Sequence, residues 1–167
     1  MSKTLKSPIP LKLTPQRFRP YGRIIHYPAK QVKVRNRNLF RIVLADKTAP
    51  GWRIAYLVVR DRKIYRLEKH PASFESFEPI CGRSLIFVAT RPDFKAIKCF
   101  YLDRPVIVNK NVWHGVVTLD RESEMKLTEN AKVRCVYWKM GRKLPLLKSD
   151  LPVGDRKEME LKYGQKE

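Results

Sequence analysis

The sequence predicts an all-β domain built as a jelly roll, and three observations lead to this prediction. β-branched and aromatic residues gather in short runs, turn residues separate the runs, and the runs recur about every 8–12 residues. This pattern is typical of a sandwich or barrel rather than of a parallel sheet covered by helices. The predicted strands are Leu39–Leu44, Trp52–Val59, Lys63–Lys69, Phe74–Ile80, Ser84–Ala89, Ile97–Leu102, Pro105–Val108, Val116–Leu119 and Val133–Trp138.

Few other elements are expected. Thr14, followed by a proline, predicts one turn of helix at Thr14–Phe18, because Thr caps helix N-termini and Pro suits the first helical position. Asp61-Arg62, between two strand-like runs, indicates a tight hairpin. The polar C-terminal segment predicts a short helix around Asp155–Tyr163.

Composition limits the class of protein. The 167 residues suit one globular domain, and 43% hydrophobic residues suffice for a core, which excludes a disordered chain. No apolar run approaches the ~18 residues of a membrane helix, and the first fifteen residues lack the apolar segment of a secretory signal. Three cysteines without a paired spacing argue against disulfides or a zinc knuckle and indicate buried thiols. A cytoplasmic location is therefore expected.

The net charge of +20 points to an anionic partner. Lys and Arg are nevertheless spread along the chain, with no block longer than two. A solvated basic surface that favours small anionic ligands is the preferred interpretation, and the charge leaves nucleic-acid binding open as an alternative.

The candidate chemistry lies around two of the three histidines. Glu68 and His70 are two residues apart in a predicted strand, so their side chains lie on the same face. Glu75 follows on the next strand, and His114 opens a strand after a turn at Asn109–Asn111.

The spacing Glu68-x-His70-x4-Glu75-x6-Gly82 resembles the first cupin motif, with Glu68 in place of the first His. A closer resemblance is to the ureidoglycolate lyase family, cupins that release urea from ureidoglycolate to give glyoxylate. It covers about residues 13 to 140, in the same order and with similar gaps. The matching segments are Phe18…Tyr21-Gly22, Asn36, Arg41, Glu68-Lys69-His70-Pro71, Glu75-Ser76-Phe77-Glu78-Pro79 and Asn111-Val112-Trp113-His114.

The resemblance implies a cupin-like double-stranded jelly-roll barrel with few short helices. Residues 1–167 then form a single domain, with 1–37 as an extended N-terminal arm and first strands, 38–140 as the barrel core and 141–167 as a polar C-terminal segment. It also implies a homodimer, a small anionic metabolite as substrate and a role in allantoin catabolism.

The implied site combines acid–base and metal chemistry. His70, His114 and Glu75 are the candidate catalytic groups, because imidazole titrates near neutral pH. The candidate metal ligands, for Zn, Mn, Fe or Ni, are Glu68, His70, Glu75 and His114. The alternative is a barrel without metal, in which the histidines form internal hydrogen bonds and Glu68 pairs with Arg66, Lys69 or Arg41. The candidate substrate-binding residues are Arg41, Asn36, Arg66, Phe77 and Trp113.

Three functions are compatible with these residues. The first is a ureidoglycolate-lyase-like enzyme. The second is a metal-binding cupin with different chemistry, an isomerase or oxygenase, and it is favoured by Glu75, which stands where the family usually has Gln. The third is a non-catalytic basic binding protein. A further departure is Asn111, which stands where the family usually has Gly.

Overall fold

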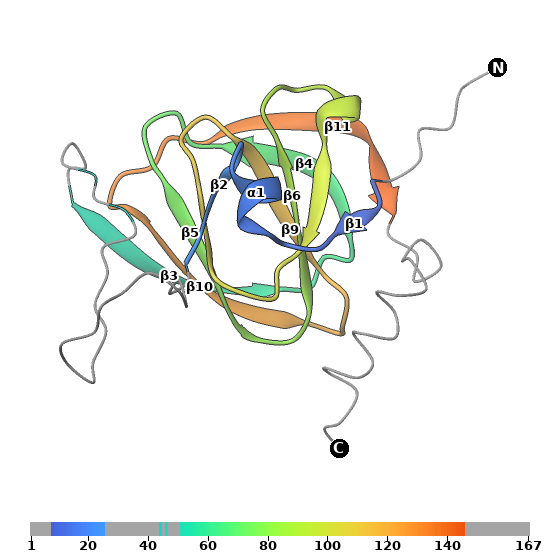
Figure 1. Cartoon of the computed structure of the whole chain (residues 1–167), viewed down its shortest axis with the longest axis horizontal. Coiled ribbons are helices and arrows are strands. Elements are labelled where there is room, and N and C mark those ends of the chain that lie inside the picture. The colour runs from blue at the N-terminus through green and yellow to red at the C-terminus, as the bar shows by residue number, and fades with distance from the viewer. Residues whose placement is uncertain (1–7, 26–43, 45, 47–50, 146–167) are drawn as a thin grey trace.

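The computed structural model of the chain describes residues 8–25, 44, 46 and 51–145 (Figure 1). Almost all regular structure in this part is β, with one short α-helix and one 3-10 turn. None of its helices is long and apolar enough to cross a membrane. The elements are β1 (Pro10–Leu11), α1 (Pro15–Phe18), β2 (Gly22–Ile24), β3 (Trp52–Val59), β4 (Lys63–Lys69), β5 (Glu75–Cys81), β6 (Ser84–Ala89), η1 (Phe94–Ala96), β7 (Lys98–Tyr101), β8 (Val106–Val108), β9 (Trp113–Thr118), β10 (Ser123–Asn130) and β11 (Val136–Pro145).

Two sheets enclose the interior, and their strand order confirms the predicted jelly roll. One sheet has the order β1-β7-β6-β9-β4-β11, and the other has the order β2-β8-β5-β10-β3. From β3 to β10 the chain passes back and forth between the sheets, except at the β6–β7 hairpin. These eight strands pair with one another only in the antiparallel sense, and β1 adds a short parallel pair with β7. This is the connectivity of the cupin-type jelly roll.

Side chains alternate between the two faces of each strand, and the inward-facing apolar ones form a core between the sheets. Met125 and Leu127 of β10 point inward with Phe77 of β5, and these side chains are almost completely buried. Helix α1 adds Phe18, whose ring packs edge-on against Phe100 at 5.4 Å. The predicted cap is confirmed, because the Thr14 side chain accepts a hydrogen bond from the backbone N–H of Arg17.

Several sequence expectations are corrected. The Asp61-Arg62 link is not a hairpin turn: β3 pairs with β10 along its whole length, and β4 lies in the other sheet. β10, between β5 and β3, was not predicted at all. Of the cysteines, Cys99 is buried, whereas Cys81 and Cys135 are exposed.

Other strand boundaries shift by a few residues, and two expectations cannot be compared with the structure. The predicted Val116–Leu119 strand begins three residues earlier, at Trp113, and the predicted Val133–Trp138 strand begins later and runs on to Pro145. The predicted helix at Asp155–Tyr163 and all but the last residue of the predicted Leu39–Leu44 strand lie outside the described residues.

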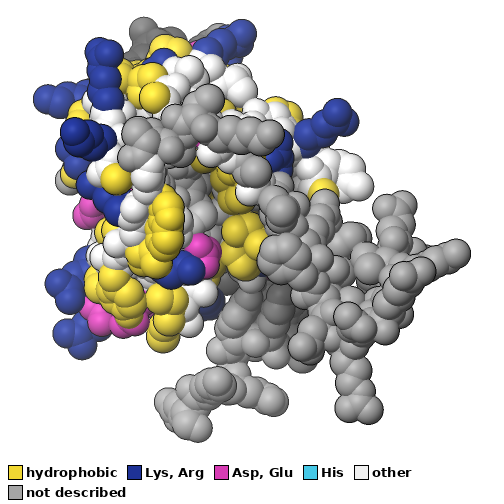
Figure 2. All heavy atoms as spheres, turned by 90° about the vertical axis from the view of Figure 1, so that its left-hand side faces the viewer, with side chains coloured by type: hydrophobic (Ala, Val, Ile, Leu, Met, Phe, Trp, Pro, Cys, Tyr) yellow, Lys and Arg dark blue, Asp and Glu magenta, His cyan; other side chains and the backbone are white. Residues whose placement is uncertain are grey.

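An apolar stripe lies on the outer face of β3. Trp52, Ile54, Tyr56 and Val58 alternate along the strand and are 67%, 58%, 61% and 37% exposed. Figure 2, which views the side of the molecule where β3 lies, shows hydrophobic side chains there among charged ones. Trp52 is the most exposed residue of the stripe. The expected homodimer stays a prediction, and an exposed edge strand of this kind is where a second copy would pair.

Gly82, the last residue of the motif, holds the turn from β5 to β6. Its φ of +74° is left-handed, and an added Cβ would lie 2.6 Å from the carbonyl oxygen of Glu122. We expect Gly82→Ala to lower the free energy of unfolding by about 2 kcal/mol or more, because backbone strain and a clash with backbone atoms add together. Urea unfolding measures this change.

Gly141 is the matched control. It also has a left-handed φ, of +65°, but an added Cβ there would meet nothing within 4 Å. Gly141→Ala should cost only the conformational strain, about 1 kcal/mol. Equal losses in the two variants would contradict the clash at Gly82.

Candidate functional site

The predicted imidazole and carboxylate groups meet inside the barrel. His70 follows the end of β4, Glu75 opens β5, and His114 lies on β9. Glu75 Oε2 is 3.0 Å from His70 Nε2 and 2.8 Å from His114 Nε2. The two rings are 5.1 Å apart, and all three side chains are buried. Convergence of the two distant histidines on an acidic group is therefore observed.

Backbone contacts hold the segment with Glu68 and His70 against the segment with Asn111 and His114. Glu68 and His114 are register partners on β4 and β9. The backbone N–H of Asn111 donates to the carbonyl oxygen of His70 over 3.0 Å. Asn111 has a φ of +64°, a conformation that Asn tolerates better than most residues other than Gly.

The histidine tautomers follow from their backbone partners. His114 Nδ1 is 2.9 Å from the carbonyl oxygen of Val112, and His70 Nδ1 is 3.4 Å from the carbonyl oxygen of Arg134. A carbonyl oxygen only accepts, so each Nδ1 carries the proton and donates. In the neutral ring, Nε2 then presents a lone pair toward Glu75. This is the arrangement of metal-ligating histidines, whose second ring nitrogen is oriented by a backbone carbonyl.

Glu75 and His114 consequently need a positive charge between them or on the ring. Two acceptors 2.8 Å apart repel each other unless a proton or a cation is shared. His114 Nε2 is buried and has no hydrogen-bond partner of suitable geometry among the described residues. A buried nitrogen in this state is costly, and a cation at this point would satisfy it.

The electrostatics of the metal-free cluster favour a charged Glu75. Burial opposes ionisation of its carboxyl group, but the contacts with the two imidazoles outweigh burial and hold its pKa at about 2. For His70, burial acts to lower the pKa, and the hydrogen bond and charge of Glu75 outweigh it, so that the pKa is raised. The cluster thus keeps positive charge beside an ionised carboxylate.

The donor atoms have spacings that suit one divalent cation. Ligands about 2.1 Å from such an ion lie about 3 Å apart when adjacent and about 4.2 Å apart when opposite. Two sets of three donors lie within 4.8 Å of one another, Glu68 with His70 and His114, and His70 with Glu75 and Glu129. The residues present therefore fit a cation.

The alternative pairing of Glu68 is not observed. The guanidinium of Arg66 lies over the ring of Tyr137, at 4.8 Å, and Lys69 Nζ lies over the ring of Trp113, at 4.9 Å. Among the described residues no ion pair joins Glu68 to either cation. Arg41, the third proposed partner, lies outside the described residues.

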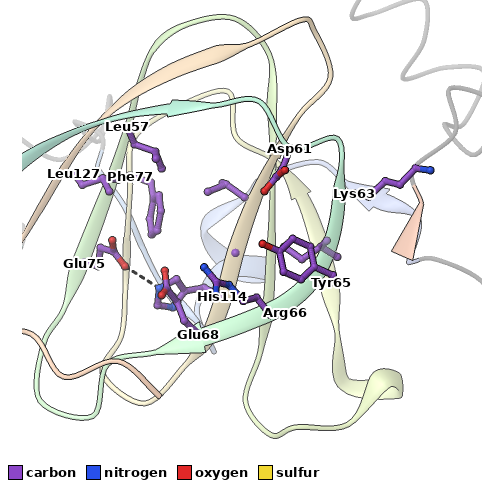
Figure 3. Close-up of a pocket in the computed structure, with 13 residues that line it drawn as sticks. Leu57, Asp61, Lys63, Tyr65, Arg66, Glu68, Glu75, Phe77, His114 and Leu127 are labelled. Atoms are coloured by element: carbon purple, nitrogen blue, oxygen red, sulfur yellow. Dashed lines mark ion pairs between the residues drawn. The ribbon is translucent and has the colours of Figure 1, made fainter. Parts of the chain in front are cut away.

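A pocket of about 160 Å³ reaches this cluster from the side of β4 and β9. An engineered cavity of about 150 Å³ holds benzene, so the pocket suits a small metabolite. Figure 3 shows Glu68, Glu75 and His114 together on its polar side, with the apolar side chains of Phe77 and Leu127 among its other lining residues.

The pocket opens where two neighbouring strands separate. Register pairing of β4 with β9 is confined to Glu68 and His114, and the next link is the bond from the Thr118 N–H to the carbonyl oxygen of Asp61. The segment from Asp61 to Glu68 is longer than the segment from His114 to Thr118 that it faces. The exposed residues Tyr65 and Arg66 line the pocket there.

The structure distributes the predicted substrate-binding residues unevenly. Phe77 and Arg66 line the pocket. Trp113 does not, because it precedes His114 on β9 and so points to the opposite face, where it packs against Trp138. Asn36 and Arg41 lie outside the described residues. His70 contacts Glu75 but is not part of the pocket wall.

Sequence reasoning missed two members of the cluster. Glu129 of β10 is buried and has its Oε2 3.9 Å from His70 Nε2. Arg53 of β3 donates to Glu129 Oε1 through Nε at 3.0 Å and Nη2 at 2.7 Å. The available signal was the alternation Met125-x-Leu127-x-Glu129, which puts a carboxylate on the inward face of a strand.

Comparisons with known proteins add nothing to the fold class, which rests on the strand order of the chain itself. No protein-family model matches the chain, and no curated protein matches it. Solved structures that resemble it include several variants of the oxalate decarboxylase of Bacillus subtilis, one of them from work on the Mn(II) centers of that enzyme. Identity is 18% and the TM-score is 0.41, over 54% of this chain and 24% of the decarboxylase chain.

The match thus spans about a quarter of the decarboxylase chain, and likeness at this level carries no argument about activity. The chain's own strand order, together with Glu68, His70, Glu75 and His114 at the meeting of β4, β5 and β9, defines a cupin-type jelly roll with a possible metal site.

The low pKa of Glu75 predicts how stability depends on pH in protein freed of metal by a chelator. In the unfolded chain this carboxyl group takes up a proton near its ordinary pKa of 4.5, whereas in the folded protein it stays ionised to about 2. The unfolded state therefore binds more protons in this interval, and the free energy of unfolding should fall as the pH falls through it.

Glu75→Gln removes this contribution, so its stability should fall less steeply than that of the wild type in urea unfolding at stepped pH. Glu78→Gln is the matched control, because Glu78 lies on the outward face of the same strand, beside Lys126. It should retain most of the wild-type pH dependence. Parallel curves for the wild type and Glu75→Gln would show that Glu75 is not held ionised.

Proposed function

We propose that this chain is a metal-binding cupin enzyme that cleaves the C–N bond of a small ureido acid, with ureidoglycolate as substrate and glyoxylate and urea as products. The observation that carries the metal site is the convergence of two backbone-anchored imidazoles on Glu75. The substrate rests on the ordered resemblance described above and on the small pocket beside the cluster.

Glu68, His70 and His114 are the residues that would hold the cation, since their donor atoms lie close together and two of the three line the pocket. Nitrogen and oxygen ligands of this kind suit Zn, Mn, Fe or Ni. When bound, such an ion supplies Lewis-acid polarisation of a substrate oxygen.

Glu75 is placed to move the proton of the reaction. The hydroxyl O–H proton must leave as the carbonyl forms, and the C–N electron pair goes to the departing nitrogen, which then takes up a proton. No other reactant is needed. Glu75 lies on the pocket wall, with its Oε2 beside the two histidines that would hold the cation, so it can accept the proton and return it to the nitrogen.

Arg66 is the candidate for the substrate carboxylate. It lines the exposed side of the pocket, and Tyr137 and Tyr65 flank its guanidinium at 4.8 and 5.7 Å. A planar guanidinium forms paired hydrogen bonds with a carboxylate. Arg41 shares this assignment by resemblance alone.

A second candidate, a cupin of different metal chemistry such as an isomerase or oxygenase, is favoured by one observation. Glu75 stands where the lyase family usually has Gln, and it adds a hard, charged oxygen donor beside both imidazoles. The two candidates share the cation and differ in the reaction.

The first test of the proposal measures cation content and glyoxylate release. We expect the wild type to bind close to one divalent transition-metal ion by elemental analysis and to release glyoxylate from ureidoglycolate. Glu75→Gln should lose at least about a hundredfold in kcat, because proton transfer by a positioned group contributes about 10²–10⁴. Glu78→Gln should retain the wild-type rate.

The outcomes separate the two candidates. A bound cation without glyoxylate release would contradict the lyase and favour the second candidate. A wild-type protein that contains no divalent cation by elemental analysis would contradict both candidate functions.

Arg66→Met tests the carboxylate contact. We expect KM for ureidoglycolate to rise roughly tenfold to a hundredfold with a smaller change in kcat, because a charge-assisted contact of about 1.5–3 kcal/mol is lost. Steady-state kinetics give the two constants. Arg62→Met is the matched control, since Arg62 is exposed in the link between β3 and β4 and does not line the pocket. Equal KM values in the two variants would rule Arg66 out.

A further inference from the structure

Three side chains form an inward-facing row across one sheet. Arg53 of β3 is the register partner of Glu129 on β10, and Glu129 is the register partner of Glu75 on β5. The row leads from the exposed edge strand β3 to the carboxylate between the two imidazoles. Neither Arg53 nor Glu129 belongs to the motif by which the site was recognised.

Arg53 holds Glu129 in one orientation. Both of its hydrogen bonds go to the same oxygen, Oε1, which leaves Oε2 on the side of His70, 3.9 Å from Nε2. The Arg53 side chain is 52% exposed, whereas that of Glu129 is 7% exposed. The guanidinium therefore anchors the carboxylate from the solvent side.

Burying Glu129 here is hard to explain by the ion pair alone. Exposed ion pairs contribute little, and a half-exposed Arg53 gives Glu129 limited compensation for its burial. Glu129 Oε2 also lies beside His70 together with the carboxylate of Glu75, because the donor atoms of these three residues are within 4.8 Å of one another. Independently, the buried Nε2 of His114 lies 2.8 Å from Glu75 Oε2 but makes no hydrogen bond of suitable geometry among the described residues. Both features are explained by a positive ion among these groups.

We propose that Glu129, held by Arg53, is an additional donor to the cation, on the side of the centre away from the pocket. The donor atoms of His70, Glu75 and Glu129 lie within 4.8 Å of one another, and the separation of 3.9 Å between His70 Nε2 and Glu129 Oε2 suits two ligands of one ion. Arg53 is then a positioning residue. This inference rests on the proposed cation site and goes beyond it.

The proposal explains where substrate would approach. Glu129 and Arg53 do not line the pocket, whereas Glu68, Glu75 and His114 do. With Glu129 on the far side, a substrate in the pocket would reach the proposed cation from the side of Glu68, Glu75 and His114.

The test is calorimetric titration of Mn²⁺, and separately Zn²⁺, into the full chain after removal of metal with a chelator and dialysis. We expect Glu129→Gln to weaken binding by about tenfold or more, in the range reported for groups that support a metal site. The matched control is Glu122→Gln, which removes the same charge from the Arg60–Glu122 pair at the opposite end of β3 and β10. It should bind as the wild type does.

Arg53→Lys provides a second variant that keeps the charge and loses the two-nitrogen contact. It should weaken binding several-fold if Arg53 positions Glu129, and thermal melting checks that each variant is folded. Binding in Glu129→Gln and Arg53→Lys equal to that in Glu122→Gln would overturn this inference and leave the proposed function standing. A wild type that binds neither cation would overturn both.

Discussion

The approach of two imidazole nitrogens to a single carboxylate oxygen is the constraint on which the interior of this protein depends. Each ring is fixed by a backbone carbonyl at Nδ1, so neither Nε2 can turn away from Glu75. Three electron-rich atoms in a buried space require positive charge. In the metal-free protein, the contacts with the imidazoles hold the pKa of Glu75 low, and the charge of Glu75 raises the pKa of His70.

The jelly roll brings these groups together because consecutive strands alternate between its sheets. β4 and β9 are neighbours in one sheet, and β5 and β10 are neighbours in the other, so histidines from one wall face carboxylates from the opposite wall. Apolar core side chains border this polar centre, and the ring of Phe77 packs edge-on against that of His114, with 5.6 Å between the centroids. A polar centre in such surroundings binds ions more strongly than the same residues would at the surface.

The sequence was most informative where spacing is local. Glu68, His70 and Glu75 lie within one strand–turn–strand unit, and His114 follows a recognisable turn, so their convergence was predictable. Glu129 was not, because β10 has only Met125 and Leu127 as apolar inward residues and its remaining sequence is typical of a loop. Arg53 was missed for the same reason, since its contact depends on β3 pairing with β10 rather than with β4.

The predictions that were wrong concern which face of a strand a side chain occupies and which strands pair with each other. Trp113 and His114 are adjacent on a strand, so only one of them can point into the pocket, and the position of the histidine decides which. A tryptophan is usually packed in the interior, but alternation along β3 places Trp52 on the outer face. The pairing of distant strands decides which face of each strand is buried, and the local periodicity of the sequence does not give this pairing.

The left-handed turn at Asn111 has a consequence for how this centre tolerates change. Its backbone N–H reaches the carbonyl of His70 only in that conformation, so one peptide unit ties the two imidazole-bearing segments to each other. Bulky or β-branched residues disfavour the conformation, and their presence would loosen the tie without removing any ligand. Mutational tolerance in this protein is thus restricted at a position that touches neither ion nor substrate.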